Sequence, residues 1–223
     1  MKLYTGPLSL FSAKVRIALA EKGLRFEHVS VGWSPERRYQ PHHPDVVALN
    51  PKRQVPVLVD GELVVCDSTR ILEYLEDRHP VPPLMPRSPA DRARCRELEA
   101  FGDEIFFLPL WDLIEEVFYP AGTSARDPGR LERARDEIAG HYAALDRRLA
   151  GADYLCGEFS IADIAVFVMV SAAVRFGAAP TSSQPELLAW LARTGGRPAV
   201  EADVEGMQRF VAGLADANAA PAA

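Results

Sequence analysis

The sequence has few of the cysteines on which disulfide-bonded and zinc-binding proteins depend. Its three cysteines, Cys66, Cys95 and Cys156, are odd in number and far apart, and no pair has the CxxC spacing of a metal or redox motif. We therefore expect all three to be buried small side chains rather than working thiols. We also expect no metal site and no prosthetic group.

The chain also lacks an excess of positive charge and a long apolar run. It has 25 Lys and Arg against 31 Asp and Glu, whereas a nucleic-acid surface needs clustered Lys and Arg. No apolar run approaches the ~20 residues that span a bilayer. Residues 1–19 carry Lys and Arg among their apolar residues, unlike a signal peptide. We expect a cytoplasmic protein whose partners include neither nucleic acid nor membrane.

What the chain does have is the composition of a folded protein, with 48% hydrophobic and 25% charged residues among 223. The first 79 residues alternate strand-like and helix-like stretches in the order β-α-β-loop-β-β-α. The most distinct element is the hairpin VPVLV-DG-ELVVC, where Asp60-Gly61 is a favoured two-residue turn. Tyr4 is expected to be part of the core.

The pattern changes after Pro80. Residues 80–89 are rich in proline and read as a stiff linker, which divides a domain of residues 1–79 from one of residues 90–223. The second domain shows helical periodicity and no convincing strand. Its first helix is expected to kink at Pro109, because the proline ring removes a hydrogen bond.

Three stretches carry a resemblance to a known family. They are YTGPLSLFSAKVRIALAEKGL, NPKRQVPVLVDGELVVCDSTRILEYLE and EFSIADIAVF, in this order and spacing. Together they resemble the cytosolic glutathione transferases, and the resemblance covers nearly the whole chain. It implies an α/β thioredoxin-like N-terminal domain plus an all-α C-terminal domain. It also implies a homodimer, with glutathione as co-substrate.

The resemblance places a working hydroxyl at Ser9, in the loop before the first helix. The thiol of glutathione has an ordinary pKa of about 8.5, so only a few per cent is thiolate at neutral pH. A hydroxyl that donates a hydrogen bond to the sulfur favours the anion, and a nearby helix N-terminus adds to the effect. The alternative is that Ser9 only caps the helix. Ser12 is expected to be the better-placed cap and is also the fallback catalytic candidate.

The resemblance assigns glutathione contacts to two further segments. It implies a cis peptide bond at Val55-Pro56, whose preceding backbone groups pair with the cysteinyl part of glutathione like an added strand. Gln54 is expected to meet the glycine end or the peptide backbone. Asp67 and Ser68 begin a helix, where Ser68 can hold the γ-glutamyl carboxylate and Asp67 the ammonium. Both residues also make ordinary helix caps, and the family more often has Glu where Asp67 stands.

Several basic residues compete to bind the glycine carboxylate. By the resemblance, His42 or His43 lies about where the family has a basic residue, and we retain His43. Arg38 and Arg53 are alternatives for the same role. Solvated loop histidines are an equally simple interpretation.

The second substrate of such an enzyme would be a hydrophobic electrophile. Its pocket is expected to be lined by Phe11, Phe107 and Trp111, with Leu8, Phe106 and Phe118 as further candidates. Aromatic residues at helical spacing are more often simply core.

Ser160-x-x-Asp163 has the pattern of a capping box, with Asp in place of the usual Glu or Gln. Its role in the family is in folding. The pattern predicts that replacing either residue by Ala lowers stability by about 1 kcal/mol and leaves glutathione affinity unchanged.

The leading functional hypothesis is a glutathione S-transferase that acts in detoxification. A glutathione-dependent isomerase or dehalogenase on the same fold is the alternative enzyme, since the thiolate can add and later leave. A non-catalytic member that binds other molecules is the alternative outside enzymes.

Overall fold

The computed structural model describes residues 1–40, 42–118 and 129–219, with backbone alone for residues 117–118 and 215–219. The strands are β1 (Lys2–Thr5), β2 (Glu27–Ser30), β3 (Val57–Asp60) and β4 (Leu63–Cys66). The helices of the first part of the chain are α1 (Leu10–Glu21), α2 (Pro44–Leu49) and α3 (Ser68–Arg78). Those that follow are α4 (Pro89–Ala100), the π-helix η1 (Phe101–Phe106), α5 (Phe107–Phe118), α6 (Arg130–Leu149), α7 (Ile161–Arg175), α8 (Pro185–Gly195) and α9 (Pro198–Ala219).

The chain divides into two compact units. Residues 1–82 form the first together with residues 196–223, and residues 83–195 form the second. One boundary therefore lies inside the proline-rich segment 80–89. The other boundary, between residues 195 and 196, differs from the predicted division, which placed everything from residue 90 onward in one domain. Helix α9 groups with the N-terminal unit because it packs on α1.

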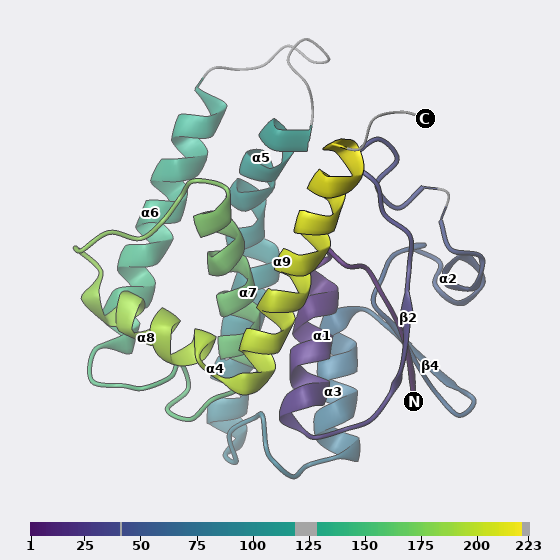
Figure 1. Ribbon diagram of the computed structural model, residues 1–223. Helices are drawn as coiled ribbons and strands as arrows, with labels where there is room; N and C mark the ends of the chain where they lie inside the picture. The colour runs from purple at the N-terminus through teal and green to yellow at the C-terminus, as the bar shows by residue number, and fades with distance from the viewer. Residues whose placement is uncertain (41, 119–128, 220–223) are drawn as a thin grey trace. The chain divides into compact units, whose positions relative to one another are not determined.

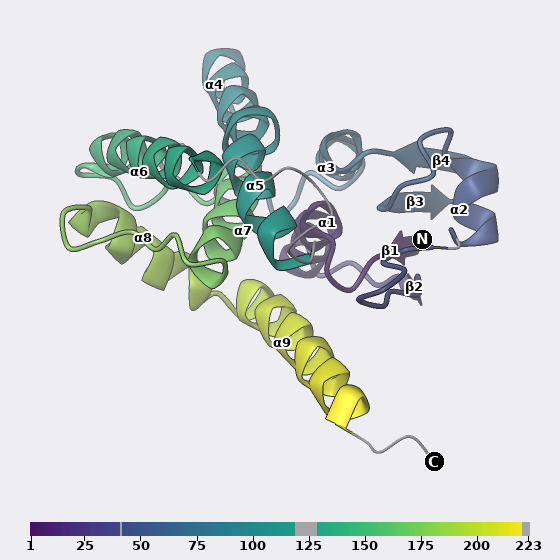
Figure 2. The ribbon, with the colours of Figure 1, turned by 90° about the horizontal axis from the view of Figure 1, so that it is seen from above.

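The first unit is built on a mixed four-stranded sheet with the order β2-β1-β3-β4. Strand β1 is parallel to β2 and antiparallel to β3, and β3 pairs with β4 as a hairpin. Figure 2 shows α1 and α3 on one face of this sheet and α2 on the other. Leu3 of β1 and Val15 and Leu19 of α1 are fully buried in the core of this unit.

Local sequence signals account for the ends of these elements. Gly23 follows α1 in the left-handed region, with φ +63°, and allows the helix to end in a tight turn. The hairpin turn lies one residue later than predicted. Asp60 pairs with Leu63, so Gly61 and Glu62 form the two-residue loop, and Gly61 supplies the positive φ. The Asp60 carboxylate instead accepts a hydrogen bond from the Tyr74 hydroxyl at 2.7 Å.

The second unit consists of helices among its described residues. Helix α7 is buried along most of its length and packs against α4, α5, η1 and α8, as Figure 1 shows for its central position in this unit. Helix α5 continues through Pro109, where a kink was predicted, and the π-helix η1 lies immediately before α5. Pro109 has no N–H to donate to the carbonyl four residues earlier, at Ile105, which is the second-last residue of η1.

Asp163 is the centre of polar contacts in this unit. The capping box is formed, and the carboxylate of Asp163 accepts hydrogen bonds from the backbone N–H and the hydroxyl of Ser160, both at 3.0 Å. It also accepts from the Leu155 N–H and the Trp190 indole N–H, each at 2.9 Å. Burial raises the pKa of the Asp163 carboxyl, while these hydrogen bonds oppose the rise. The fully buried carboxylate thus joins α7 to α8 and to the segment before α7.

The cysteines differ from their expected burial. Cys95 is buried, but Cys66 and Cys156 are half-buried, so the prediction was wrong for these two. Cys95 and Cys156 are far apart in the sequence and hydrogen-bond to each other, and this contact lowers the pKa of the Cys95 thiol while burial opposes it. Sequence spacing could not show this pair because α4 and the segment before α7 meet only in the folded unit.

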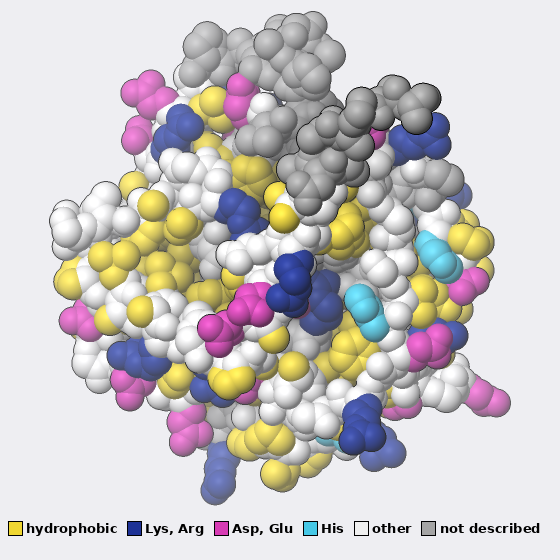
Figure 3. All heavy atoms as spheres, viewed as in Figure 1, with side chains coloured by type: hydrophobic (Ala, Val, Ile, Leu, Met, Phe, Trp, Pro, Cys, Tyr) yellow, Lys and Arg dark blue, Asp and Glu magenta, His cyan; other side chains and the backbone are white. Residues whose placement is uncertain are grey.

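The surface carries charges of both signs. On the face in Figure 3, acidic and basic side chains are interspersed among apolar and neutral ones. Among the described residues, no helix is both long and apolar enough to cross a membrane.

Candidate functional site

Ser9 lies at the N-terminus of α1, in the turn that leaves β1. It is the N-cap residue, with extended backbone angles, and its Oγ accepts a hydrogen bond from the Ser12 N–H at 3.2 Å. The first N–H groups of a helix have no intrahelical acceptor, so positive partial charge gathers beside this hydroxyl. Ser9 is half-buried, which leaves its hydroxyl within reach of a bound molecule.

Ser12 does not have the role that was expected of it. The cap of α1 is Ser9, and Ser12 is fully buried, with its Oγ accepting the Gly6 N–H at 3.2 Å. The expectation that Ser12 is the better cap was wrong, because the helix begins at Leu10 rather than after Ser12. A side chain buried in this way does not suit the fallback catalytic role. Ser12 instead holds the shape of the Gly6–Ser9 turn.

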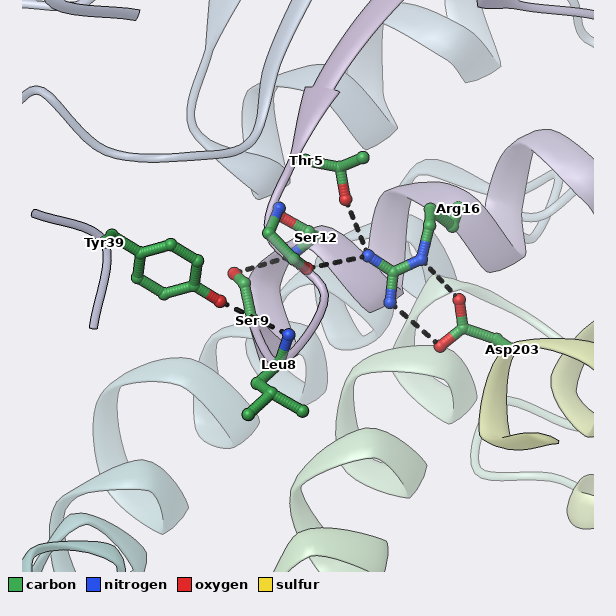
Figure 4. Close-up of polar contacts among 8 residues, drawn as sticks. Thr5, Leu8, Ser9, Ser12, Arg16, Tyr39 and Asp203 are labelled. Atoms are coloured by element: carbon green, nitrogen blue, oxygen red, sulfur yellow. Dashed lines mark hydrogen bonds and ion pairs between the residues drawn. The ribbon is translucent and has the colours of Figure 1, made fainter. Parts of the chain in front are cut away.

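Arg16 fixes the same turn from within α1. Its guanidinium donates to the Thr5 hydroxyl at 2.6 Å and to the Gly6 carbonyl at 3.1 Å, and the Ser9 N–H donates to that carbonyl at 3.2 Å. The other side of the guanidinium forms a two-point ion pair with Asp203 of α9, at 2.6 and 3.2 Å. Figure 4 shows this chain of contacts from Asp203 to the turn.

Tyr39 lies against the same turn from the loop between β2 and α2. Its hydroxyl oxygen accepts the Leu8 N–H at 3.3 Å, and Figure 4 shows the phenol pointing at the part of the turn that holds Leu8 and Ser9. Burial raises the pKa of Tyr39 to about 12, while the Leu8 hydrogen bond and the Arg16 charge act in the other direction.

Arg16, Asp203 and Tyr39 were not predicted from the sequence. One signal was available for Arg16, which together with Lys14 is one of two charged residues in the mostly apolar stretch of residues 10–20 and so calls for a partner. Its partner Asp203 is 187 positions away, and no local pattern relates the two. Tyr39 lies in a proline-rich loop whose conformation the sequence does not define.

Asp203→Ala is expected to lower the free energy of unfolding by about 2 kcal/mol, because it removes a charge-assisted two-point pair. It should also speed hydrogen exchange of the Leu8 and Ser9 amides, measured by NMR. Glu21→Ala is the matched control, since Glu21 forms a similar pair with Arg197, also joining α1 to the segment at the start of α9. Equal exchange at Leu8 and Ser9 in both variants would show that Arg16 does not depend on Asp203 to hold the turn.

The Val55-Pro56 peptide bond is cis in the structure, as expected. Pro56 is buried and Val55 half-buried, and Val55 packs on a cluster formed by Tyr4, Val31, Val46 and Val57. Gln54 is exposed, and its carbonyl accepts the Asn50 side-chain N–H at 2.7 Å. Burial of Tyr4 in this cluster confirms its expected place in the core.

Asp67 and Ser68 begin α3, as the pattern predicted. Asp67 is the N-cap and accepts the Thr69 N–H at 3.1 Å, while its other oxygen lies 3.7 Å from the Lys52 ammonium. Both side chains are exposed, so an incoming ammonium group would compete with Lys52 for this carboxylate. Ser68 is buried, which leaves its hydroxyl little access to solvent.

The expected basic residues lie in two segments. His43 is the N-cap of α2, with Nδ1 accepting the Asp45 N–H at 3.3 Å and its ring 5.5 Å from that of Tyr4. His42 pairs with the Gln40 side chain at 2.8 Å. Arg38 and Arg53 both have left-handed backbone angles, with φ of 57° and 56°. The cap leaves Nε2 of His43 as the nitrogen that a carboxylate could contact.

The expected pocket residues separate into core and surface. Phe11 is half-buried in the first unit, and Phe107 and Trp111 contact each other in the second, with ring centroids 5.7 Å apart. Phe106 is fully buried, so it belongs to the core and the pocket assignment was wrong for it. Leu8 is half-buried. The side chain of Phe118 lies outside the described residues. No cluster of three metal-ligating side chains occurs in the part of the chain that the structure describes.

Two models of one protein family match two separate parts of the chain. Residues 3–83 match the family model for the N-terminal domain of glutathione S-transferase, and residues 128–193 match that for the C-terminal domain. The chain is 45% identical to the stringent starvation protein A homologue of Coxiella burnetii, over 73% of this chain and 71% of that protein. It is 32% identical to the FtsZ-localized protein A of Caulobacter vibrioides, over 88% and 87%, and 34% identical to the maleylacetoacetate isomerase of Pseudomonas aeruginosa, over 80% and 84%.

Among solved structures, a glutathione S-transferase of Methylobacterium radiotolerans in complex with glutathione sulfonate is 32% identical. It aligns with a TM-score of 0.75 over 91% of this chain and 93% of that one. The chain belongs to the glutathione S-transferase family. The expected fold, a thioredoxin-like N-terminal domain plus a helical C-terminal domain, is confirmed.

Proposed function

We propose that this protein is a glutathione transferase that conjugates the thiolate of glutathione to a small hydrophobic electrophile. The observation that carries the proposal is Ser9, a half-buried hydroxyl that caps α1 where the positive end of the helix favours an anion. In the reaction, sulfur forms a bond to an electrophilic carbon and the leaving group departs with its electron pair. A cytoplasmic homodimer that serves in detoxification completes the proposal.

The remaining glutathione contacts are proposed from the same unit. The backbone of Val55 would pair with the cysteinyl part, with Gln54 toward the glycine end and His43 on the glycine carboxylate. The N-terminus of α3 at Asp67 and Ser68 would hold the γ-glutamyl group. Phe11, Phe107 and Trp111 would contact the electrophile, and their apolar character favours a hydrophobic partner.

The first experiment is retention of the protein on immobilised glutathione, followed by a conjugation assay with an activated aryl chloride. Retention with conjugation would support the proposal. Retention without conjugation would favour an isomerase or dehalogenase, a reading that the similarity to maleylacetoacetate isomerase also supports. Failure to bind glutathione would exclude all three enzymes.

Ser9→Ala is expected to raise the pKa of the bound thiol by about one to two units, because the anion loses its hydroxyl donor. The rate falls as the pH drops through the pKa of the bound thiol, so the acid limb of the profile should move to higher pH. At a pH below the pKa of the bound thiol, kcat/KM should fall about 10- to 100-fold. The measurements are the pH profile of conjugation and the ultraviolet absorbance of the bound thiolate.

Ser12→Ala is the matched control. Ser12 lies on the same turn of the helix as Ser9, but the hydroxyl that the substitution removes is buried in the protein interior. The substitution should lower thermal stability because the Gly6 N–H loses its acceptor, and it should change the pKa of the bound thiol less than Ser9→Ala does, because the hydroxyl that it removes gives no hydrogen bond to the sulfur. A shift in Ser12→Ala and none in Ser9→Ala would reverse the assignment.

A second candidate function is binding of another protein without catalysis. Two relatives whose names describe no transferase activity, the stringent starvation protein A homologue and the FtsZ-localized protein A, align over most of this chain. Loss of glutathione retention in an intact, folded protein would favour this candidate. Its partner would then be sought by crosslinking in the source cell.

A further inference from the structure

A second hydroxyl, that of Tyr39, contacts the Gly6–Ser9 turn in addition to the hydroxyl of Ser9. The Tyr39 hydroxyl accepts a hydrogen bond from the Leu8 N–H, one residue before Ser9. A phenol can accept and donate at the same time, so this contact leaves the phenolic proton for another acceptor. Figure 4 shows the hydroxyl at the end of the ring nearest Leu8 and Ser9.

Gly6 lets the phenol come this close. A Cβ at position 6 would lie 2.5 Å from the Tyr39 hydroxyl oxygen and 2.7 Å from two ring carbons, well inside normal contact distance. Any side chain at this position would therefore displace the ring. The glycine serves close approach rather than an unusual backbone angle.

The position of the ring is set by its own loop and by the core beneath it. Ser34 and Arg38 exchange backbone hydrogen bonds at 3.0 and 2.6 Å, closing a small loop directly before Tyr39. The ring packs on the same buried cluster as Val55. The phenol thus lies on the cluster that also supports the segment proposed to hold the cysteinyl part of glutathione.

The protonation state of Tyr39 suits a donor. With a pKa raised to about 12 by burial, the phenol keeps its proton throughout the neutral range. The Arg16 guanidinium, which holds the Gly6 carbonyl, acts on the phenol electrostatically and adds positive potential at the same turn.

We propose that Tyr39 is a further catalytic residue, whose hydroxyl donates a second hydrogen bond to the sulfur of glutathione beside that of Ser9. This inference rests on the proposed function. The Leu8 N–H donates to the phenol oxygen, and the phenol donates to the sulfur, so the three groups form one directed chain. Two donors on the sulfur stabilise the thiolate more than one.

The test uses the full chain with glutathione as the probe. Tyr39→Phe keeps the ring and removes the donor, and Tyr74→Phe is the matched control, because its hydroxyl contacts Asp60 at the hairpin of the same unit. The pKa of the bound thiol is read from thiolate absorbance against pH, and glutathione affinity from calorimetry.

In Tyr39→Phe, the pKa of the bound thiol should rise by about one unit, and conjugation at a pH below that pKa should fall about tenfold. At a pH above the pKa of the bound thiol, the affinity for glutathione should fall by a similar factor, because the thiolate loses a donor. Tyr74→Phe should match the wild type in the pKa of the bound thiol, in conjugation and in affinity. A shift in Ser9→Ala with none in Tyr39→Phe would overturn the role of Tyr39 and leave the proposed function standing. Absence of glutathione binding in the wild type would overturn both.

Gly6→Ala provides a second route to the same conclusion, because the added methyl displaces the phenol without altering it. The same rise in the pKa of the bound thiol is expected. Gly32→Ala is its control, since a Cβ there meets no atom within 4 Å among the described residues. An unchanged pKa in Gly6→Ala, with the ring shown to be displaced, would contradict the inference.

Discussion

Asp163→Ala is expected to lower the free energy of unfolding by about 3–5 kcal/mol, among the largest effects of any single substitution in this chain. The sequence pattern alone predicts about 1 kcal/mol, the value of an ordinary helix cap. The structure raises the expected loss of stability because the Asp163 carboxylate accepts hydrogen bonds beyond those of the helix cap.

Removal of the Asp163 carboxylate leaves three N–H groups without their acceptor. They belong to Leu155, Ser160 and the Trp190 indole, and Trp190 is fully buried. Each unsatisfied buried donor costs about 1–3 kcal/mol, and alanine offers no replacement. Since water has no ready access to this site, the losses should largely accumulate.

Ser160→Ala and Asp146→Ala are the matched controls for Asp163→Ala. Ser160 takes part in the same capping box, while Asp146 accepts one hydrogen bond, from the Leu187 N–H at 3.0 Å. Each of these two substitutions is expected to lower the free energy of unfolding by about 1 kcal/mol. Urea denaturation and thermal melting measure all three, and for Asp163→Ala the melting temperature should fall by about 10 °C. A loss equal to that of Ser160→Ala would show that Asp163 acts only as a cap.

Glutathione affinity gives a separate readout of Asp163. The residues proposed to bind glutathione belong to the unit of residues 1–82, whereas Asp163 belongs to that of residues 83–195. At a temperature where Asp163→Ala remains folded, its affinity for glutathione should equal that of the wild type.

Local patterns predicted most of the fold because local physics determines those features. The hairpin, the helix that begins at Ser68 and the capping box at Ser160 each depend on residues within a few positions of one another. Even so, the hairpin turn was displaced by one residue. Asp60-Gly61 and Gly61-Glu62 both satisfy the requirement for a glycine, and only the pairing of the strands decides between them.

Contacts between distant segments were not predictable in this way. That Ser9 rather than Ser12 caps α1 depends on where the helix begins, and the Gly6–Ser9 turn that sets this start is held by Arg16. Arg16 in turn is held by Asp203, so part of the environment of the candidate site comes from the C-terminal helix. Helical periodicity predicted a helical second domain, but periodicity does not say on which unit a helix such as α9 packs.

Lys22→Ala is the second substitution with a large expected effect, about 3–5 kcal/mol in the free energy of unfolding. The Lys22 ammonium lies at the end of α1, and its side chain is 1% exposed. It donates to the Glu76 carboxylate, to the His79 carbonyl and to the Pro82 carbonyl, each at 2.8 Å. One side chain therefore binds the end of α3 and the segment that follows it.

The loss of stability arises from the buried groups that lose their contact with the Lys22 ammonium. The Glu76 side chain is 6% exposed, and without the ammonium its buried charge loses a close counter-charge, while two carbonyls lose a donor. Lys22→Met fills the same volume and should lose nearly as much, because the missing group is the charge rather than the methylenes. Lys22→Met combined with Glu76→Leu should recover part of the loss, since it removes both charges together.

Lys52→Ala is the control that separates burial from charge in the Lys22 experiment. Lys52 lies 3.7 Å from Asp67, but the two side chains are 70% and 44% exposed, so the pair should contribute at most about 1 kcal/mol. Salt should reduce the Lys52 effect and leave the Lys22 effect nearly unchanged, because solvent ions screen exposed pairs far more than buried ones. If Lys22→Ala and Lys52→Ala lost the same stability, with the same dependence on salt, the three contacts of Lys22 would not be what holds α1 to the end of α3.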